Sequence, residues 1–342
     1  MWSGHGDRAG DAAAAFPSAE AVLVWLRELP APVAVAYEAG PTGFDLARQL
    51  VAAGVRCVVA APSKLQRPAG DRIKTDARDA LLLARLLRMD EIVQVRVPSI
   101  EQEAARDLVR AREDARGDLM RCRHRVSKLL LRHGIVYSGG HPCNGATRRG
   151  FGVSDSTSVA SSSRSTPTWR PCCSPWTAVT ASTRPSPRWP PMVNTLPSCG
   201  GWVCLRGVST LTAFGLAVEV GDWHRFTGAT IGAYLGLVPT ESSSGQQRCQ
   251  GSITKAGNTH ARRLLVEAAW HHRRDYRNPG ATMRARWKLA SPAATARGNA
   301  GNHRLHQRWE NFVARKKKTV IANVAVAREL AGWCWSLAVL DD

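Results

Sequence analysis

Residues 31–60, APVAVAYEAGPTGFDLARQLVAAGVRCVVA, decide the fold class of the N-terminal part of this chain. The two ends of this stretch, residues 31–37 and 55–60, are short apolar runs bounded by turn residues, which is typical of buried strands. Between them, residues 42–53 gather apolar side chains on one side of a helix that ends at Gly54. A second helical pattern covers residues 75–88. The order strand, helix, strand, helix predicts an α/β domain with helices packed over the strands.

A long, arginine-rich helix is predicted over residues 103–132. Apolar or small side chains recur along it every seven residues, at Leu108, Ala115, Cys122 and Leu129. A heptad spacing favours a coiled-coil arm, and such an arm would make the protein a homo-oligomer. A basic amphipathic helix packed on its own domain explains the same pattern equally well.

The charge of the chain indicates a polyanionic partner. It has 47 Lys and Arg against 27 Asp and Glu, a formal net charge of +20, which suits nucleic acid or an anionic membrane. The apolar residues 320–340 carry Arg328 and Glu329 near their middle, so a buried amphipathic helix explains them better than a membrane span. The nine cysteines form no CxxC pair and the opening residues lack a signal-peptide pattern. We therefore expect a reduced, cytoplasmic protein that acts on nucleic acid and has no membrane partner.

Residues 144–202 interrupt this pattern, and the predicted plan has four parts. These are an α/β domain at 1–98, a helical arm at 99–143, the interruption, and a mostly α-helical C-terminal domain at 203–342. Within the interruption, residues 151–200 are rich in Ser, Thr and Pro, carry Trp and Cys, and contain no Glu, Lys or Ile. A disordered linker is the ordinary interpretation of Ser and Pro richness. We favour the hypothesis of a frameshifted segment, because out-of-frame GC-rich DNA yields this mixture.

Three carboxylates in the N-terminal part are candidate metal ligands. Glu38 stands at the end of a predicted strand, and Asp76 and Asp79 lie three apart near the start of a helix. Carboxylates that converge from a strand end and a helix start can hold two Mg²⁺ ions, which prefer oxygen ligands. The alternative is that Asp76 and Asp79 are favourable first-turn acids on a helix dipole. Spacing alone favours that alternative.

A second block of motifs begins in the C-terminal part. Residues 206–213, RGVSTLTA, predict a helix-hairpin-helix-like turn in which Gly207 lets backbone N–H groups approach a phosphate. Further along come SSSG at 242–245, GSITKAGN at 251–258 and RRLLVEAAW at 262–270.

Basic residues of the same region are candidate nucleic-acid contacts. The candidates are Lys255, Arg262, Arg263, Arg315, Lys316 and Lys317. A solvated charged face is the alternative for each of them. His271 and His272 are expected to be solvated, and the tryptophans at 223, 270, 333 and 335 are expected to pack in the core.

These blocks resemble one known family. YEAGPTG at 37–43, PSK at 62–64 and KTDARDA at 74–80, followed in order by the second block, resemble the insertion-sequence 110/116/902 transposases. The resemblance implies an RNase-H-like, RuvC-like domain with an Asp-Glu-Asp-Asp (DEDD) site for Mg²⁺, of which Glu38, Asp76 and Asp79 are the last three members. Nothing before Glu38 matches the first Asp, and neither Asp7 nor Asp11 is assigned to it. We expect that the start is truncated or misassigned.

The resemblance also implies a nucleophile and a second partner. A serine of the Ser-Ser-Gly motif would attack a DNA phosphate and form a phosphoserine link, with Ser244 the first candidate and Ser243 the second. From the residues alone, a polar turn cap explains these serines. The family further implies a structured RNA, encoded by the element, that pairs with DNA and supplies sequence choice.

The leading functional prediction is a transposase or site-specific recombinase that cleaves and rejoins DNA at a composite site of carboxylates and serine. An inactive nucleic-acid-binding remnant of a decayed element is the alternative of another class. The unmatched first Asp and the interruption at 144–202 favour inactivity of this polypeptide. A RuvC-like junction nuclease would need the carboxylates but not the serine block, so the C-terminal motifs disfavour it.

Overall fold

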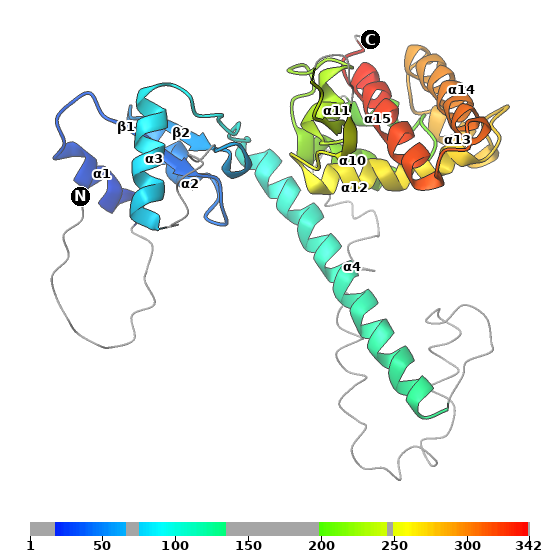
Figure 1. Ribbon diagram of the computed structural model, residues 1–342, viewed down its shortest axis with the longest axis horizontal. Helices are drawn as coiled ribbons and strands as arrows, with labels where there is room; N and C mark the ends of the chain where they lie inside the picture. The colour runs from blue at the N-terminus through cyan, green and yellow to red at the C-terminus, as the bar shows by residue number, and fades with distance from the viewer. Residues whose placement is uncertain (1–17, 66–74, 135–197, 245–248, 341–342) are drawn as a thin grey trace. The chain divides into compact units, whose positions relative to one another are not determined.

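The computed structural model describes residues 18–65, 75–134, 198–244 and 249–340 (Figure 1). The segment at 151–197, the terminal Asp7 and Asp11, and Gly245 lie outside these ranges. The chain divides into two compact units, Met1–Ser99 and Ile100–Asp342, and each is described by itself. The predicted long helix therefore belongs to the same compact unit as the C-terminal residues.

The N-terminal unit contains the predicted strand–helix–strand–helix order. Strand β1 (Ala34–Glu38) pairs in parallel with β2 (Arg56–Ala60), and helix α2 (Asp45–Ala52) connects them. Helix α3 (Asp76–Arg88) packs against β1. The α/β prediction is confirmed for these elements, each within a few residues of its expected bounds. The described part of this unit forms a two-stranded sheet.

Two short elements of the N-terminal unit were not predicted. Helix α1 (Ala19–Arg27) begins at the N-cap Ser18, whose hydroxyl accepts from the amide of Ala21, and α1 contacts α2. A 3₁₀ turn, η1 (Pro62–Lys64), follows β2. The buried core of the unit is small and consists of Leu26, Ala47, Leu50, Val58, Val59, Ala60 and Leu83.

The C-terminal unit is mostly helical, as predicted. Its elements are α4 (Ile100–Arg132), α9 (Ser198–Trp202), α10 (Thr210–Val220), α11 (Thr230–Tyr234), β3 (Pro239–Glu241), β4 (Gln250–Ile253), α12 (Thr259–Ala269), η3 (Trp270–Arg273), α13 (Ala281–Trp287), α14 (Pro292–Ala314) and α15 (Thr319–Ala338).

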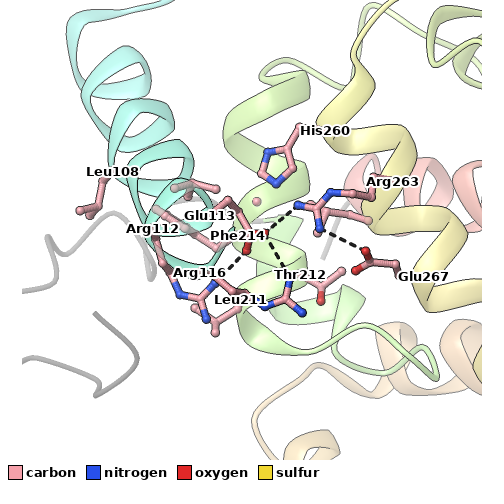
Figure 2. Close-up of a pocket in the computed structure, with 13 residues that line it drawn as sticks. Leu108, Arg112, Glu113, Arg116, Leu211, Thr212, Phe214, His260, Arg263 and Glu267 are labelled. Atoms are coloured by element: carbon pink, nitrogen blue, oxygen red, sulfur yellow. Dashed lines mark hydrogen bonds and ion pairs between the residues drawn. The ribbon is translucent and has the colours of Figure 1, made fainter. Parts of the chain in front are cut away.

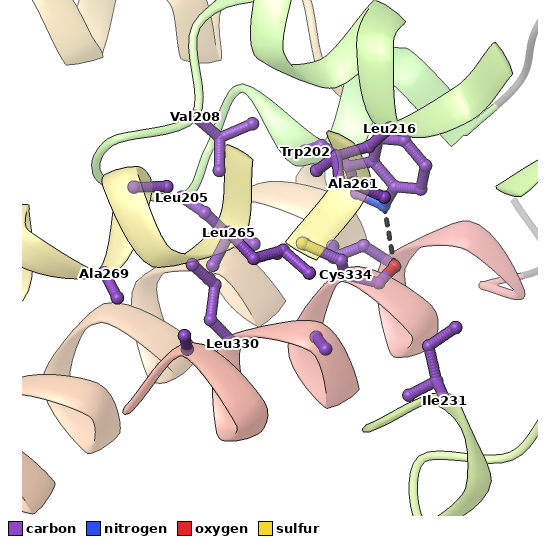
Figure 3. Close-up of a cluster of buried hydrophobic side chains, with 14 of the residues drawn as sticks. Trp202, Leu205, Val208, Leu216, Ile231, Ala261, Leu265, Ala269, Leu330 and Cys334 are labelled. Carbon is purple, nitrogen blue, oxygen red and sulfur yellow. Dashed lines mark hydrogen bonds between the residues drawn. The ribbon is translucent and has the colours of Figure 1, made fainter. Parts of the chain in front are cut away.

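Helix α15 is the centre of the main core. It packs against α9, α11, α12 and α14, and Val326, Ala327 and Leu330 along it are fully buried. Figure 3 shows Trp202 of α9 in this core, where its indole N–H donates to the carbonyl of Cys334 at 2.6 Å. The prediction of a buried helix over residues 320–340 is confirmed. In the part of the chain that the structure describes, no helix is long and apolar enough to cross a membrane.

The first turns of α4 pack on the body of the same unit. Ala105 is buried against Phe214 and Val218 of α10. The side chains of Gln102 and Arg106 both donate to the carbonyl of Val218, at 3.0 and 3.2 Å. This part of α4 is therefore an amphipathic helix packed on its own unit, while self-association through the heptad stays a prediction.

Candidate functional site

The predicted nucleophiles lie on a short β-hairpin. Strands β3 and β4 are antiparallel, with Glu241 opposite Gln250, and the amide of Ser242 donates to the carbonyl of Cys249 at 2.9 Å. Ser243 and Ser244 follow Ser242 into the loop, and all three are exposed. The hairpin therefore presents serine hydroxyls to solvent, where an extended substrate can reach them.

Ser243 has an acidic neighbour that the sequence analysis did not identify. Its hydroxyl donates to Oε1 of Glu241 at 3.0 Å and accepts from the amide of Cys249 at 3.3 Å. The side chain of Gln250 donates to the other oxygen of Glu241 at 3.3 Å. A carboxylate that accepts the hydroxyl proton is a group that can activate a serine. The same contacts also make a stable polar turn, so the geometry supports both interpretations.

The base of the hairpin is held by backbone geometry. Gly236 and Gly257 have positive φ angles of 65° and 72°, and a Cβ at Gly257 would collide with the carbonyl of Tyr234. Lys255 also has a positive φ, 55°, and its amide donates to the carbonyl of Gly236 at 3.1 Å. Its side chain is exposed, which leaves the prediction of a phosphate contact at Lys255 open.

Arg262 uses its guanidinium within the fold. Its Nη1 donates to the carbonyls of Leu235 and Ala256, at 3.0 and 2.9 Å, and its Nη2 donates to Thr259 at 3.1 Å. The bonds to Leu235 and Ala256 join helix α12 to the segments before and after the hairpin. Arg262 therefore has a structural role that neither sequence interpretation included, and a nucleic-acid contact from it stays a prediction.

Arg263 belongs to an ion-pair network between α12 and α4 (Figure 2). It pairs with Glu267 at 3.1 Å and with Glu113 of α4 at 2.8 Å, and Glu113 also pairs with Arg112 at 2.9 Å. The network borders a cavity of about 200 Å³ with an apolar wall that includes Phe214. Each arginine that lines the cavity is already paired with a carboxylate, since Arg116 also lies 3.6 Å from Glu113. We therefore interpret this cavity as part of the contact between the two helices.

Glu219 of α10 is the most buried charged group of the region. Its side chain has no exposed surface and receives both Nε and Nη2 of Arg110, each at 2.9 Å. The side-chain amide of Asn258 donates to the Glu219 carboxylate at 2.5 Å, and Nδ1 of His260 lies 3.1 Å from its other oxygen. Burial alone raises the pKa of the Glu219 carboxyl, but the hydrogen bonds from His260, Arg110 and Asn258 outweigh burial and hold this pKa well below its usual range. Glu219 therefore stays ionised and joins α4, α10 and the start of α12.

Gly207 occupies the turn between α9 and α10. Its φ is 79°, and a Cβ there would overlap the carbonyl of Ala268. Close packing of two backbones thus requires glycine at this position. An open cavity of about 490 Å³ next to it is lined by Arg206, Arg286 and His271, among others. A phosphate contact at Gly207 stays a prediction beside this structural requirement.

The basic residues and histidines that remain from the sequence predictions differ in how exposed they are. Arg315, Lys316 and Lys317 are exposed in the turn between α14 and α15, and His271 is exposed as expected. The expectation for His272 is wrong, because turn η3 directs it inward and leaves it 0% exposed. Burial lowers the pKa of His272 to about 3.

The four tryptophans mostly meet the packing expectation. Trp223 is buried, and Trp333 and Trp335 pack against the main core. Trp270 is 39% exposed and contacts Trp309. The tryptophans are therefore packing residues of unequal burial.

The three candidate metal ligands stand where the sequence placed them. Glu38 is the last residue of β1 and is exposed, while Asp76 and Asp79 lie in the first turn of α3, which Thr75 caps. Their oxygens are the donors that Mg²⁺ prefers. Among the described residues, however, no three His, Cys, Asp or Glu side chains come together in a group that could hold a metal ion. In the described geometry these three carboxylates therefore do not form a closed metal site.

Comparisons with known proteins match both parts of the chain. The profile described as the transposase IS116/IS110/IS902 family matches residues 204–288, which include the serine hairpin. A transposase profile of the DEDD, IS110 type matches residues 11–135.

Individual relatives extend these matches over most of the chain. A candidate transposase of Sinorhizobium fredii, y4qE, is 38% identical over 88% of this chain and 74% of its own length. The transposase for insertion sequence element IS1533 of Leptospira borgpetersenii is 30% identical over 82% of each chain. A probable family 20 transposase of Pseudomonas aeruginosa is 27% identical over 40% of this chain and 33% of its own.

Proposed function

The chain belongs to the IS116/IS110/IS902 family of insertion-sequence transposases, and from that premise we propose that it cleaves and rejoins DNA strands during transposition. The observation that carries this proposal is the exposed serine hairpin inside the segment that the family profile matches. Ser244 stays the first candidate nucleophile, and Ser243 gains support from its contact with Glu241.

The proposed step is a phosphoryl transfer to serine. The hydroxyl oxygen attacks a DNA phosphorus, a Ser–O–P bond forms, and the bond from phosphorus to one strand oxygen breaks. If Ser243 is the nucleophile, Glu241 takes its proton, and the departing strand oxygen leaves as a hydroxyl after it is protonated. Rejoining reverses the step when a strand hydroxyl attacks the phosphoserine. The charge is balanced, because the phosphodiester within the DNA strand is replaced by a phosphodiester between serine and DNA.

Further parts of the proposal rest on the family resemblance. We propose a RuvC-like arrangement for the N-terminal unit, with Glu38, Asp76 and Asp79 as Mg²⁺ ligands. We also propose that DNA is the substrate, that an element-encoded RNA guides target choice, and that the protein acts as a homo-oligomer.

A covalent-trapping experiment tests the central proposal. The full chain is incubated with Mg²⁺ and end-labelled DNA that carries both ends of its own element, and labelled protein is detected on a denaturing gel. The Ser244→Ala variant should lose the label, while Ser243→Ala should keep it. If the reverse occurs, Ser243 is the nucleophile, and Glu241→Gln should then reduce labelling while DNA binding is unchanged.

The inactive-remnant alternative is favoured by one observation, that the described carboxylates do not form a metal group. In that case the wild-type chain should bind element DNA without any covalent label, under conditions in which the Leptospira relative is labelled. Labelling of the wild-type chain would exclude the remnant.

A further inference from the structure

An open groove lies between α14 and α15, and its lining residues, apart from Gly228 and Ala229, lie outside both segments that the family profiles match. It encloses about 540 Å³, and its lining includes Arg297 and Arg308 of α14 with Arg328, Trp333 and Ser336 of α15. This α14–α15 groove has no part in the proposed chemistry, and its composition is unusual for a simple helix contact.

Helical spacing places its residues in two facing stripes. Arg297 and Arg308 are eleven residues apart on α14, which returns them to nearly the same side of the helix. Ala325 and Ser336 have the same separation on α15. Eleven residues span about 16 Å of helix, so the groove is an extended channel rather than a round pocket.

The groove carries an excess of positive charge. Glu329 is its one acidic lining residue in the part that the structure describes. This carboxylate pairs with Arg304 at 2.9 Å and with Arg308 at 3.4 Å. Arg297 donates to the hydroxyl of Ser336 at 2.9 Å, and Arg328 lines the groove as an exposed residue. Such a groove attracts an anionic ligand.

Trp333 adds an aromatic wall. Two residues of α14 contact its ring. The guanidinium of Arg297 lies 4.6 Å from the ring centre, and a Cβ added at Gly301 would lie 3.0 Å from the nearest ring atoms. Gly228, Gly332 and Trp335 are also among the lining residues, and the ring of Trp335 lies against Gly228, so a second aromatic side chain borders the groove. Aromatic rings that alternate with arginines bind nucleobases by stacking and phosphates by charge.

We propose that the α14–α15 groove binds an unpaired nucleotide of a single-stranded nucleic acid. Trp333 stacks on the base, and Arg328 and Arg308 contact the flanking phosphates. A base in a duplex is already stacked on both faces and cannot reach a partly buried tryptophan, so the site selects single strands. The inference rests on the proposed function only in taking nucleic acid as the partner, and it requires no cleavage.

Equilibrium binding of the full chain to a labelled oligothymidylate tests the arginine contacts. Arg328→Gln should weaken binding, and the slope of log K against log salt should become less steep by about 0.7, the value for one phosphate contact of a single strand. Arg273→Gln is the matched control, because Arg273 is exposed on η3 and does not line the groove. Equal effects of the two variants would overturn the assignment.

Trp333→Leu tests stacking. The variant should bind the oligothymidylate about 5- to 150-fold more weakly, with an unchanged salt slope and little change for a duplex of the same length. Thermal unfolding checks that the variant is folded. An oligouridylate of equal length shows whether RNA or DNA is preferred, and weaker binding of either by Trp333→Leu supports the site. A folded Trp333→Leu with wild-type affinity for both would refute it. Because no cleavage is measured, failure here is distinct from failure of the covalent-trapping experiment.

Discussion

Glu219 shows how a single buried charge can organise three helices. Its partners Arg110 and His260 lie 109 and 41 residues away in sequence. No local pattern marks such a group, because its surroundings consist of side chains that only the fold brings together. The role of Glu219 therefore follows from the structure and not from the sequence. A buried, paired carboxylate is costly to disturb, since removal of its charge leaves cations without a counterion.

Glu219→Gln should destabilise the C-terminal unit by about 3 kcal/mol, in the range for breaking a buried ion pair. The amide keeps the shape of the side chain but cannot neutralise Arg110. Urea unfolding followed by far-ultraviolet circular dichroism measures the loss. Glu310→Gln, an exposed change on α14, is the control and should have almost no effect. If both variants unfold at the same urea concentration, the network contributes no net stability.

His272 should make the fold sensitive to acid. Its pKa is about 3 in the folded protein against 6.5 ordinarily, so below pH 6.5 the unfolded chain binds a proton that the folded chain does not. Stability is therefore complete above about pH 6.5 and decreases as the pH falls toward 3, by up to about 1.4 kcal/mol per pH unit. Glu219 acts in the same direction below its ordinary pKa of 4.5, because its folded pKa is also lowered.

Urea unfolding at pH 7, 6, 5 and 4 measures the contribution of His272. His272→Leu should give a flatter dependence on pH between 6.5 and 4.5 than the wild type. His124→Leu, an exposed change on α4, should keep the wild-type dependence. A wild-type slope in His272→Leu would show that other groups cause the acid sensitivity.

At the scale of elements, periodicity predicted the long helices α4 and α15 and both strands of the N-terminal unit, but the long helix α14 was not predicted. Strands β1 and β2 and helices α2 and α3 appear where apolar runs and helical spacing placed them. The β3–β4 hairpin was not predicted, because strands of three and four residues are too short to show alternation. The family motif indicated the serines, whereas the contact of Ser243 with Glu241, two residues earlier in the chain, became visible only in the side-chain geometry.

Gly207→Ala should destabilise the C-terminal unit far more than Gly134→Ala. Both glycines have a positive φ, 79° and 70°, so alanine is strained at either position by about 1–2 kcal/mol. At Gly207 the added methyl would also overlap the carbonyl of Ala268, whereas nothing lies within 4 Å of it at Gly134. Thermal unfolding of the two variants compares them. Equal losses would mean that φ alone requires glycine at Gly207, and the packing argument would be wrong.

At the scale of the molecule, each compact unit carries one of the two predicted chemistries. The carboxylates Glu38, Asp76 and Asp79 belong to the N-terminal unit, and the serine hairpin belongs to the C-terminal one. Sequence motifs could assign both, because each motif is local. The composite site stays a prediction, since it depends on contacts between units that no local pattern encodes. The net charge of +20 is a property of the whole chain, and it leads to the final prediction.

Affinity for duplex DNA should fall steeply with salt, because each phosphate contact contributes about −0.9 to the slope of log K against log salt. Neutralising Arg315, Lys316 and Lys317 together with Gln should make the slope less steep by about 1 to 3 if this exposed turn contacts DNA. Titration of a labelled duplex at several salt concentrations measures the slope. The matched control neutralises Arg125, Lys128 and Arg132, which are exposed on α4.

The comparison of the two triple variants separates a local contact from a general effect of charge. Both variants lower the net charge by the same amount, so a long-range attraction would weaken to a similar extent in each. A contact at the α14–α15 turn would instead change the slope mainly in the variant at residues 315–317, because counterion release depends on which cations lie against phosphates. Equal slopes would assign the binding to the charge of the whole molecule and remove this turn from the DNA-binding surface.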